Sequence, residues 1–100
     1  MTQSLSPLLA KLRALKPELA QHFGVSGIAI FGSYARGEAH PESDLDLLLD
    51  FAADARPTFF TLARLDAFLQ EKLGVKVDTI PRESLNPRIE PYIRAELVAA

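Results

Sequence analysis

Residues 31–51 of the chain read FGSYARGEAHPESDLDLLLDF. This stretch connects a short apolar run, GIAIF at residues 27–31, to a second run that begins at Asp44 and ends at Phe51. Asp44 and Asp46 lie one residue apart at the start of the second run, although burying carboxylates in a strand normally lowers stability. The stretch therefore indicates both how the strands are arranged and where chemistry is expected.

Short apolar runs bounded by glycine or proline predict three strands. They fall at residues 27–31, 44–51 and 75–80, and the final residues, LVAA, are a candidate edge strand. Apolar residues spaced three and four apart predict helices between them. The first begins at Ser6-Pro7, and Pro17 predicts a kink or a break in it. Three more are expected at residues 33–39, 58–73 and about 87–96.

The predicted elements alternate in the order α-β-α-β-α-β-α, which is typical of helices packed on a sheet. Only about a dozen residues separate the first two strands, which is short for a parallel crossover. We therefore expect an α/β (α+β) fold with a small mixed sheet of three to four strands, in a single domain spanning residues 1–100.

Composition narrows the function classes. The chain has 100 residues, 48% of them hydrophobic, with no cysteine and a net charge of −2. No cysteine means no disulfide and no thiolate metal site. No apolar run approaches the ~20 residues of a membrane helix, and no signal peptide is recognised. We expect a soluble cytoplasmic protein that does not bind a membrane or duplex nucleic acid directly.

Side chains alternate along a strand, so Asp44 and Asp46 are predicted to share a face, opposite the leucines. Two close carboxylates repel each other unless a cation lies between them, and carboxylate oxygens suit Mg²⁺ or Mn²⁺. Asp78 is a third candidate if the third strand neighbours the second. The alternative is that such aspartates are solvated turn residues, and Asp50 is interpreted as a solubility residue.

The Gly32-Ser33 pair follows the first predicted strand and precedes a predicted helix. Glycine allows a close backbone approach to a ligand, and N–H groups at a helix start attract anions. The pair is thus a candidate phosphate site, although such pairs are also ordinary turns with a helix cap. Of the other side chains, we expect His22 and His40 at the surface, and the phenylalanines in the core: Phe59, Phe60 and Phe68.

Together these motifs resemble the signature of the DNA polymerase β-like nucleotidyltransferases, which is Gly-Ser, ten residues, then Asp-x-Asp. The resemblance is closest to the minimal nucleotidyltransferases, whose pattern includes G-S-x-A-R-G and S-D-x-D-L. The matching residues are Gly32, Ser33, Ala35, Arg36, Gly37, Ser43, Asp44, Asp46 and Leu47. Asp78 fits the third carboxylate of the family, although Thr79 beside it is less apolar than usual.

The resemblance implies Mg²⁺-dependent transfer of a nucleoside monophosphate, with two ions. Asp44 and Asp46 would bind both ions, and Asp78 would bind one and help to deprotonate the acceptor. Gly32 and Ser33 would hold phosphates, and Arg36 would contact a phosphate or a partner, or anchor its own segment to a carboxylate.

The family also implies a partner. Minimal nucleotidyltransferases are commonly antitoxins of HEPN-type ribonuclease toxins, and some members modify a toxin tyrosine with AMP. The leading hypothesis is therefore an enzyme that transfers AMP from ATP to a hydroxyl of such a toxin, in a possible hetero-oligomer. The alternatives are an antitoxin that neutralises by binding alone, and a nucleotidyltransferase that acts on a small molecule or an RNA end.

Overall fold

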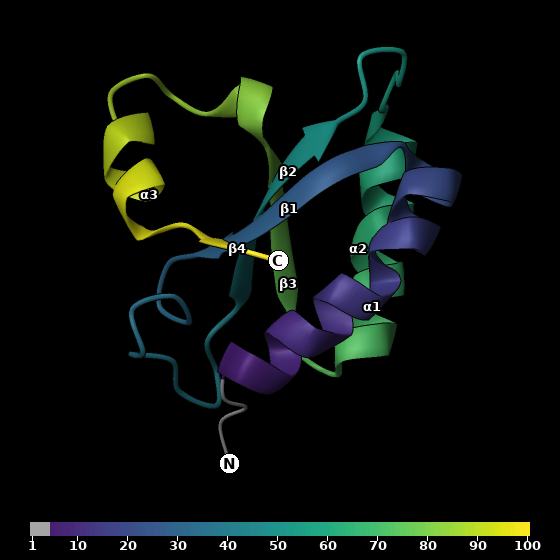
Figure 1. Cartoon of the computed structure of the whole chain (residues 1–100). Coiled ribbons are helices and arrows are strands. Elements are labelled where there is room, and N and C mark those ends of the chain that lie inside the picture. Colours follow the sequence, from purple (N-terminus) through teal and green to yellow (C-terminus); the bar gives the residue numbers. More distant parts are fainter. Residues whose placement is uncertain (1–4) are drawn as a thin grey trace.

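The computed structural model describes residues 5–100, which form a four-stranded sheet flanked by helices (Figure 1). Along the chain the elements are α1 (Leu5–Phe23), β1 (Val25–Phe31), β2 (Leu45–Phe51), α2 (Phe59–Leu73), β3 (Val77–Pro81), the 3₁₀ turn η1 (Arg82–Ser84), α3 (Glu90–Glu96) and β4 (Val98–Ala99). The sheet order is β3-β2-β1-β4. β1 and β2 therefore form the centre of the sheet, and they fix the two ends of the segment that connects them, residues 32–44.

The sheet is mixed, as the short connection after the first strand predicted. β1 pairs antiparallel with β2 and with β4, whereas β2 pairs parallel with β3. The parallel pair is joined through α2, because a parallel crossover needs a long connection that is usually helical. The candidate edge strand at the C-terminus is confirmed as β4, which pairs Ala29 with Ala99 and Ile30 with Val98.

The main core lies between the sheet and the two long helices. α1 and α2 lie on one side of the sheet, and α3 lies on the other (Figure 1). Alternate leucines of β2 point into this core with leucines of both helices, and all are fully buried: Leu8, Leu12, Leu19, Leu45, Leu47, Leu49, Leu65, Leu69 and Leu73. The predicted inward face of β2 is confirmed. None of the helices within residues 5–100 is long and apolar enough to cross a membrane.

Local sequence signals explain where α2 begins and ends. Thr58 caps its start, because the Thr58 hydroxyl accepts from the Thr61 amide and the Thr61 hydroxyl accepts from the Thr58 amide. Gly74 ends it in the left-handed conformation with φ 73°, and its amide donates to the Gln70 carbonyl. The predicted boundaries of this helix are confirmed.

Two sequence expectations are wrong, and one of the two alternatives for the first helix is excluded. Residues 33–37 form successive turns instead of a helix, because Gly37 at φ 72° stops the chain after about one turn. α1 continues through Pro17 from Leu5 to Phe23, so the break expected there as the alternative to a kink is excluded. Phe59 and Phe60 are 91% and 82% exposed rather than buried, because they form the first turn of α2 and its packing against the core starts at Leu62.

Candidate active site

The central observation concerns the position of the third carboxylate. In the parallel pairing of β2 with β3, Asp46 and Asp78 are register partners. Neighbouring strands lie about 4.8 Å apart, so the two carboxylates stand side by side at the edge where β2 begins. Asp44 is exposed and lies one residue before β2, so it reaches this edge from a loop and not from the strand itself.

Asp46 carries the electrostatic signature of this cluster. Burial, followed by the nearby charges of Asp78 and Asp44, raises its pKa from an ordinary 3.8 to about 6. Glu96 adds a smaller rise, and the Arg36 guanidinium opposes it. Negative charge at this edge is therefore only partly compensated by the protein, and a cation here would relieve the repulsion.

Gly32 brings the end of β1 against this carboxylate. Its φ is +76°, and a Cβ at this position would lie 2.1 Å from the Asp46 Oδ2 atom. Glycine is strongly favoured here, because the left-handed backbone disfavours a side chain and the Asp46 carboxylate would have to move to make room for one. The Gly-Ser turn thus lies directly against Asp46, an arrangement that fits a metal-bound phosphate.

The turn that follows Gly32 presents a row of backbone amides. Its internal bonds run from the Arg36 amide to the Gly32 carbonyl at 3.1 Å and from the Glu38 amide to the Ser33 carbonyl at 2.8 Å. Within residues 5–100, the amides of residues 33, 34 and 35 donate to no protein acceptor. Consecutive unpaired amides in a turn can bind anions, so the candidate phosphate site lies in a turn and not at the predicted helix start.

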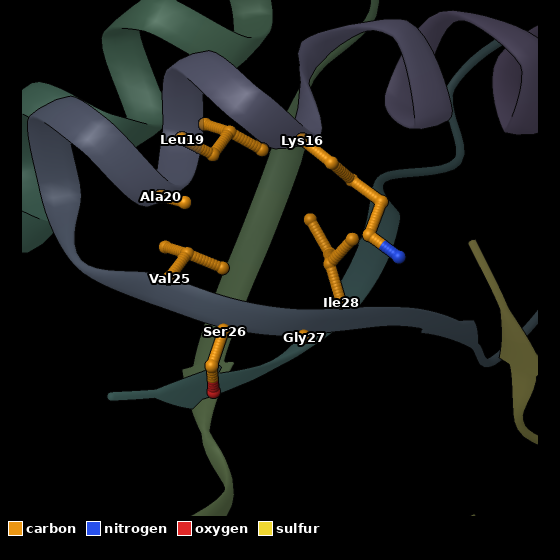
Figure 2. Close-up of a pocket in the computed structure, with 7 residues that line it drawn as sticks. All are labelled: Lys16, Leu19, Ala20, Val25, Ser26, Gly27 and Ile28. Atoms are coloured by element: carbon orange, nitrogen blue, oxygen red, sulfur yellow. The ribbon is translucent and has the colours of Figure 1, made fainter. Parts of the chain in front are cut away.

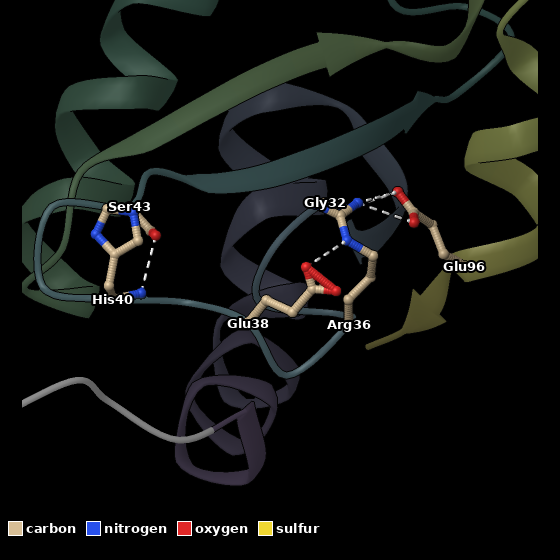
Figure 3. Close-up of polar contacts among 6 residues, drawn as sticks. All are labelled: Gly32, Arg36, Glu38, His40, Ser43 and Glu96. Carbon is tan, nitrogen blue, oxygen red and sulfur yellow. Dashed lines mark hydrogen bonds and ion pairs between the residues drawn. The ribbon is translucent and has the colours of Figure 1, made fainter.

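Arg36 is held by two glutamates (Figure 3). Its Nη1 donates to both carboxylate oxygens of Glu96, at 3.3 and 3.1 Å, and its Nε donates to Glu38 at 3.5 Å. The Gly32 amide also donates to Glu96 Oε1, at 3.1 Å. These carboxylates raise the pKa of the Arg36 guanidinium, which accordingly stays a fixed positive charge next to the turn.

Glu96 is the residue of this site that the sequence did not reveal. It lies 64 positions from Gly32, at the last residue of α3. A glutamate at the end of a short helix is ordinary in any sequence. The signal that places it here is the pairing of β4 with β1, which only the fold supplies.

The aspartate cluster fits a divalent metal in its donor chemistry. The three aspartates offer the all-oxygen donors that Mg²⁺ prefers, and the raised pKa of Asp46 marks a position where a cation would be stabilised. No group of three or more His, Asp or Glu side chains between residues 5 and 100 is arranged to hold a metal ion as it stands. The aspartate side chains would therefore have to rotate before they could bind one ion together.

Other polar residues lie outside the site or shape its edge. Asp50 accepts from the Arg82 Nε at 2.6 Å and Nη2 at 3.1 Å, so it forms an ion pair and is more than the solubility residue expected. His22 and His40 are at the surface, as predicted. The His40 amide donates to the Ser43 hydroxyl at 2.9 Å, which orders the turn before Asp44 (Figure 3).

A hollow of about 240 Å³ lies elsewhere, between α1 and β1 (Figure 2). Its lining is mainly apolar, with residues Lys16, Leu19, Ala20, Val25, Ser26, Gly27 and Ile28. The Lys16 amine already donates to the Ala100 carbonyl at 3.0 Å. The hollow includes none of the three aspartates, so it is not the place where the candidate chemistry would occur.

Comparison with known proteins identifies the family. A match to the nucleotidyltransferase domain covers residues 12–99. The chain belongs to the nucleotidyltransferase domain family. It is similar to the protein adenylyltransferase MntA of Thermococcus cleftensis, with 40% identity over 87% of this chain and 86% of that protein. The nucleotidyltransferase class expected from the Gly-Ser and Asp-x-Asp motifs is confirmed.

Solved structures support the same fold assignment. A chain provisionally described as a minimal nucleotidyltransferase matches with a TM-score of 0.79 and 38% identity, covering 96% of this chain and 95% of that one. A chain from the complex of an AMPylated HEPN toxin of Shewanella oneidensis with an MNT antitoxin matches with a TM-score of 0.63 and 18% identity, covering 91% of this chain and 68% of that one. The chain therefore shares its mixed-sheet fold with these solved structures.

Proposed function

We propose that this nucleotidyltransferase transfers AMP from ATP, with Mg²⁺, to a tyrosine hydroxyl of a HEPN-type ribonuclease toxin and thereby acts as its antitoxin. The observation that carries the proposal is the pairing of Asp46 with Asp78 directly beside Gly32. This arrangement brings unmet negative charge next to a turn whose amides attract anions. A metal-bound triphosphate complements both parts.

Each residue has a role in this proposal. Asp44, Asp46 and Asp78 would hold one or two Mg²⁺ ions, which supply charge stabilisation for the transferring phosphoryl group. Gly32 gives the backbone its close approach, and Ser33 offers its amide and hydroxyl to the β- and γ-phosphates. The Gly32 amide itself is bound by Glu96, so the phosphate contacts fall to the amides that follow it.

The transfer step needs no reactant other than ATP and the acceptor hydroxyl. The acceptor oxygen forms a bond to the α-phosphorus of ATP, the bond from that phosphorus to the bridging oxygen breaks, and pyrophosphate leaves. The acceptor proton passes to Asp78, which is exposed and so is accessible to an incoming hydroxyl. The positioned turn and aspartates would supply orientation, which accounts for much of phosphoryl-transfer catalysis.

A protein acceptor is supported by the relatives and by the surface. The T. cleftensis relative is named a protein adenylyltransferase, and the S. oneidensis complex contains an AMPylated HEPN toxin. Phe59 and Phe60 are 91% and 82% exposed, and large exposed apolar side chains often mark protein contacts. A docked partner would bring its own hydroxyl to the site.

The direct test uses ATP labelled on its α-phosphate, Mg²⁺ and a HEPN-type toxin that binds the chain. Label is expected on the toxin with the wild-type protein. The Asp44→Asn/Asp46→Asn variant should lose at least about a thousandfold of this rate, whereas the control Asp50→Asn on the same strand should keep it. Absence of label in a complex that forms would refute transfer.

The same variants separate catalysis from binding. If AMP transfer neutralises the toxin, Asp44→Asn/Asp46→Asn should fail to rescue growth in cells that express it, and Asp50→Asn should rescue. Rescue by both variants would instead support the antitoxin that acts by binding alone. Transfer of the label to a small-molecule acceptor or an RNA end, with none on the toxin, would support the small-molecule or RNA alternative.

A further inference from the structure

Glu96 connects the C-terminal segment to the phosphate-binding turn. Its carboxylate accepts from the Gly32 amide and from Nη1 of Arg36, at distances of 3.1 to 3.3 Å (Figure 3). These partners lie 64 and 60 positions away in the sequence. The contact therefore depends on the folded arrangement of α3 and β4 against β1.

The strand register explains how Glu96 reaches Gly32. β4 pairs with β1 at two positions, Ala29 with Ala99 and Ile30 with Val98. Extending this antiparallel register by two residues brings Glu96 opposite Gly32. The Gly32 amide donates a hydrogen bond to the Glu96 side chain. If β4 were longer, a backbone carbonyl would accept this bond instead. The residue at which the turn begins is thus anchored.

The same carboxylate orients Arg36 and leaves part of it available. The guanidinium donates through Nη1 to Glu96 and through Nε to Glu38. Its Nη2 group donates to no acceptor among residues 5–100. Arginine binds phosphate through such N–H groups in a fixed planar geometry. A guanidinium held on one side and free on the other is arranged for an anion.

Resting on the proposed function, we propose that Glu96 is a positioning residue of the triphosphate site. It fixes Gly32 and Arg36 so that the amides of residues 33–35 and the Arg36 Nη2 group together receive the β- and γ-phosphates. Glu96 bonds to none of those four donors, so it does not occupy the positions that the phosphates would take. A competing role, in which Glu96 blocks the nucleotide, predicts the opposite change in affinity.

The test compares Glu96→Ala and Glu96→Gln with the control Glu90→Gln. Glu90 lies on the same helix and pairs with Arg94, so its variant also removes a glutamate–arginine pair but leaves the turn untouched. The first measurement is the dissociation constant of a non-hydrolysable ATP analogue with Mg²⁺. Glu96→Ala should weaken it by about tenfold or more, Glu96→Gln by less, and Glu90→Gln by under about twofold.

Two further readouts distinguish positioning from a general loss of structure. In the transfer assay, Glu96→Gln should raise KM for ATP while kcat stays within about twofold. Amide hydrogen exchange at Gly32 should accelerate by about tenfold or more in Glu96→Ala, a measurement that needs no nucleotide. Circular dichroism and thermal unfolding identify a variant that fails to fold, in which case Glu96→Gln decides.

Each outcome has a defined meaning. Unchanged or tighter nucleotide binding in folded Glu96→Ala or Glu96→Gln would overturn the positioning role, and tighter binding would indicate a blocking role. If the wild-type protein binds no nucleotide, the proposed function fails and this inference fails with it. If nucleotide binding holds in the wild type but the Glu96 variants match Glu90→Gln, only the inference about Glu96 fails.

Discussion

The two ends of β2 carry aspartates in contrasting surroundings. Asp46 and Asp50 lie four residues apart on the same face of the strand. The Arg82 guanidinium binds Asp50 through two hydrogen bonds, whereas Asp46 has Asp78 as its neighbour and a pKa raised to about 6. The charge of Asp50 is compensated by an ion pair, whereas that of Asp46 is only partly compensated, by Arg36. The uncompensated charge, and not the presence of acidic residues, therefore distinguishes the end of β2 that we propose as the active site.

The largest predicted stability effect tests how tightly the Asp46 end is packed. Gly32→Ala should lower the free energy of unfolding by about 3 kcal/mol, because the added methyl would lie 2.1 Å from Asp46 Oδ2 at a residue with φ +76°. Gly37→Ala is the matched control, since Gly37 has φ +72° but a Cβ added there would meet no atom within 4 Å. It should lose about 1 kcal/mol. Equal losses in urea unfolding would show that Asp46 does not crowd Gly32.

Replacing each aspartate in turn should change stability in opposite directions. Without Mg²⁺ at pH 7, Asp46→Asn should raise the free energy of unfolding by about 1 kcal/mol, after allowance for the solvent screening of a half-exposed group. Asp50→Asn should lower it by about 0.5 kcal/mol, because it removes a surface ion pair with Arg82. Urea unfolding in EDTA measures both values. A change of the same sign in the free energy of unfolding for both variants would contradict the proposed difference between the two ends of β2.

The effect of Asp46 should also depend on pH in a defined window. Its pKa is about 6 in the folded protein and an ordinary 3.8 otherwise. The folded state therefore binds more protons between these values, and the Asp46 contribution to stability falls as pH rises from about 4 to about 6. The advantage of Asp46→Asn over wild type should grow across this range and stay level above it. A difference independent of pH would contradict the raised pKa.

The smallest predicted effect concerns coupling between neighbours. In a double-mutant cycle, Asp50→Asn and Arg82→Gln should show a favourable coupling of about 0.5 kcal/mol, as for a partly exposed pair. Asp46→Asn and Asp78→Asn should show a coupling of the opposite sign, because either change alone relieves the shared repulsion. Free energies of unfolding in EDTA supply both cycles. Strictly additive values at the Asp46 end would show that the two carboxylates do not interact.

Much of the fold was predictable because it follows from local signals. Each signal spans only a few residues: the apolar run of β2, the Thr58 cap and the Gly74 stop of α2, and the short link that disfavours a parallel β1–β2 pair. The wrong expectations depended on packing or on backbone geometry. Phe59 extends beyond the core contacts of α2, and Gly37 stops a helix after about one turn.

The candidate site was predictable only in part, for the same physical reason. The Gly32-Ser33 pair and Asp44 with Asp46 are close in sequence, so their proximity could be inferred from alternation and turn chemistry. The position of Asp78 depends on which strand β3 pairs with, and that of Glu96 depends on β4 pairing with β1. Contacts between distant segments are set by the whole sheet, and no local pattern encodes them.

The most direct test of the central claim is calorimetric titration of a non-hydrolysable ATP analogue with Mg²⁺ into three proteins. Wild type and Asp50→Asn should bind with dissociation constants within about twofold of each other. Asp46→Asn should bind at least about a hundredfold more weakly, because loss of a metal ligand costs more than loss of a residue that only orients one. Equal binding by Asp46→Asn and Asp50→Asn would contradict the claim that the uncompensated end of β2 is the metal-nucleotide site.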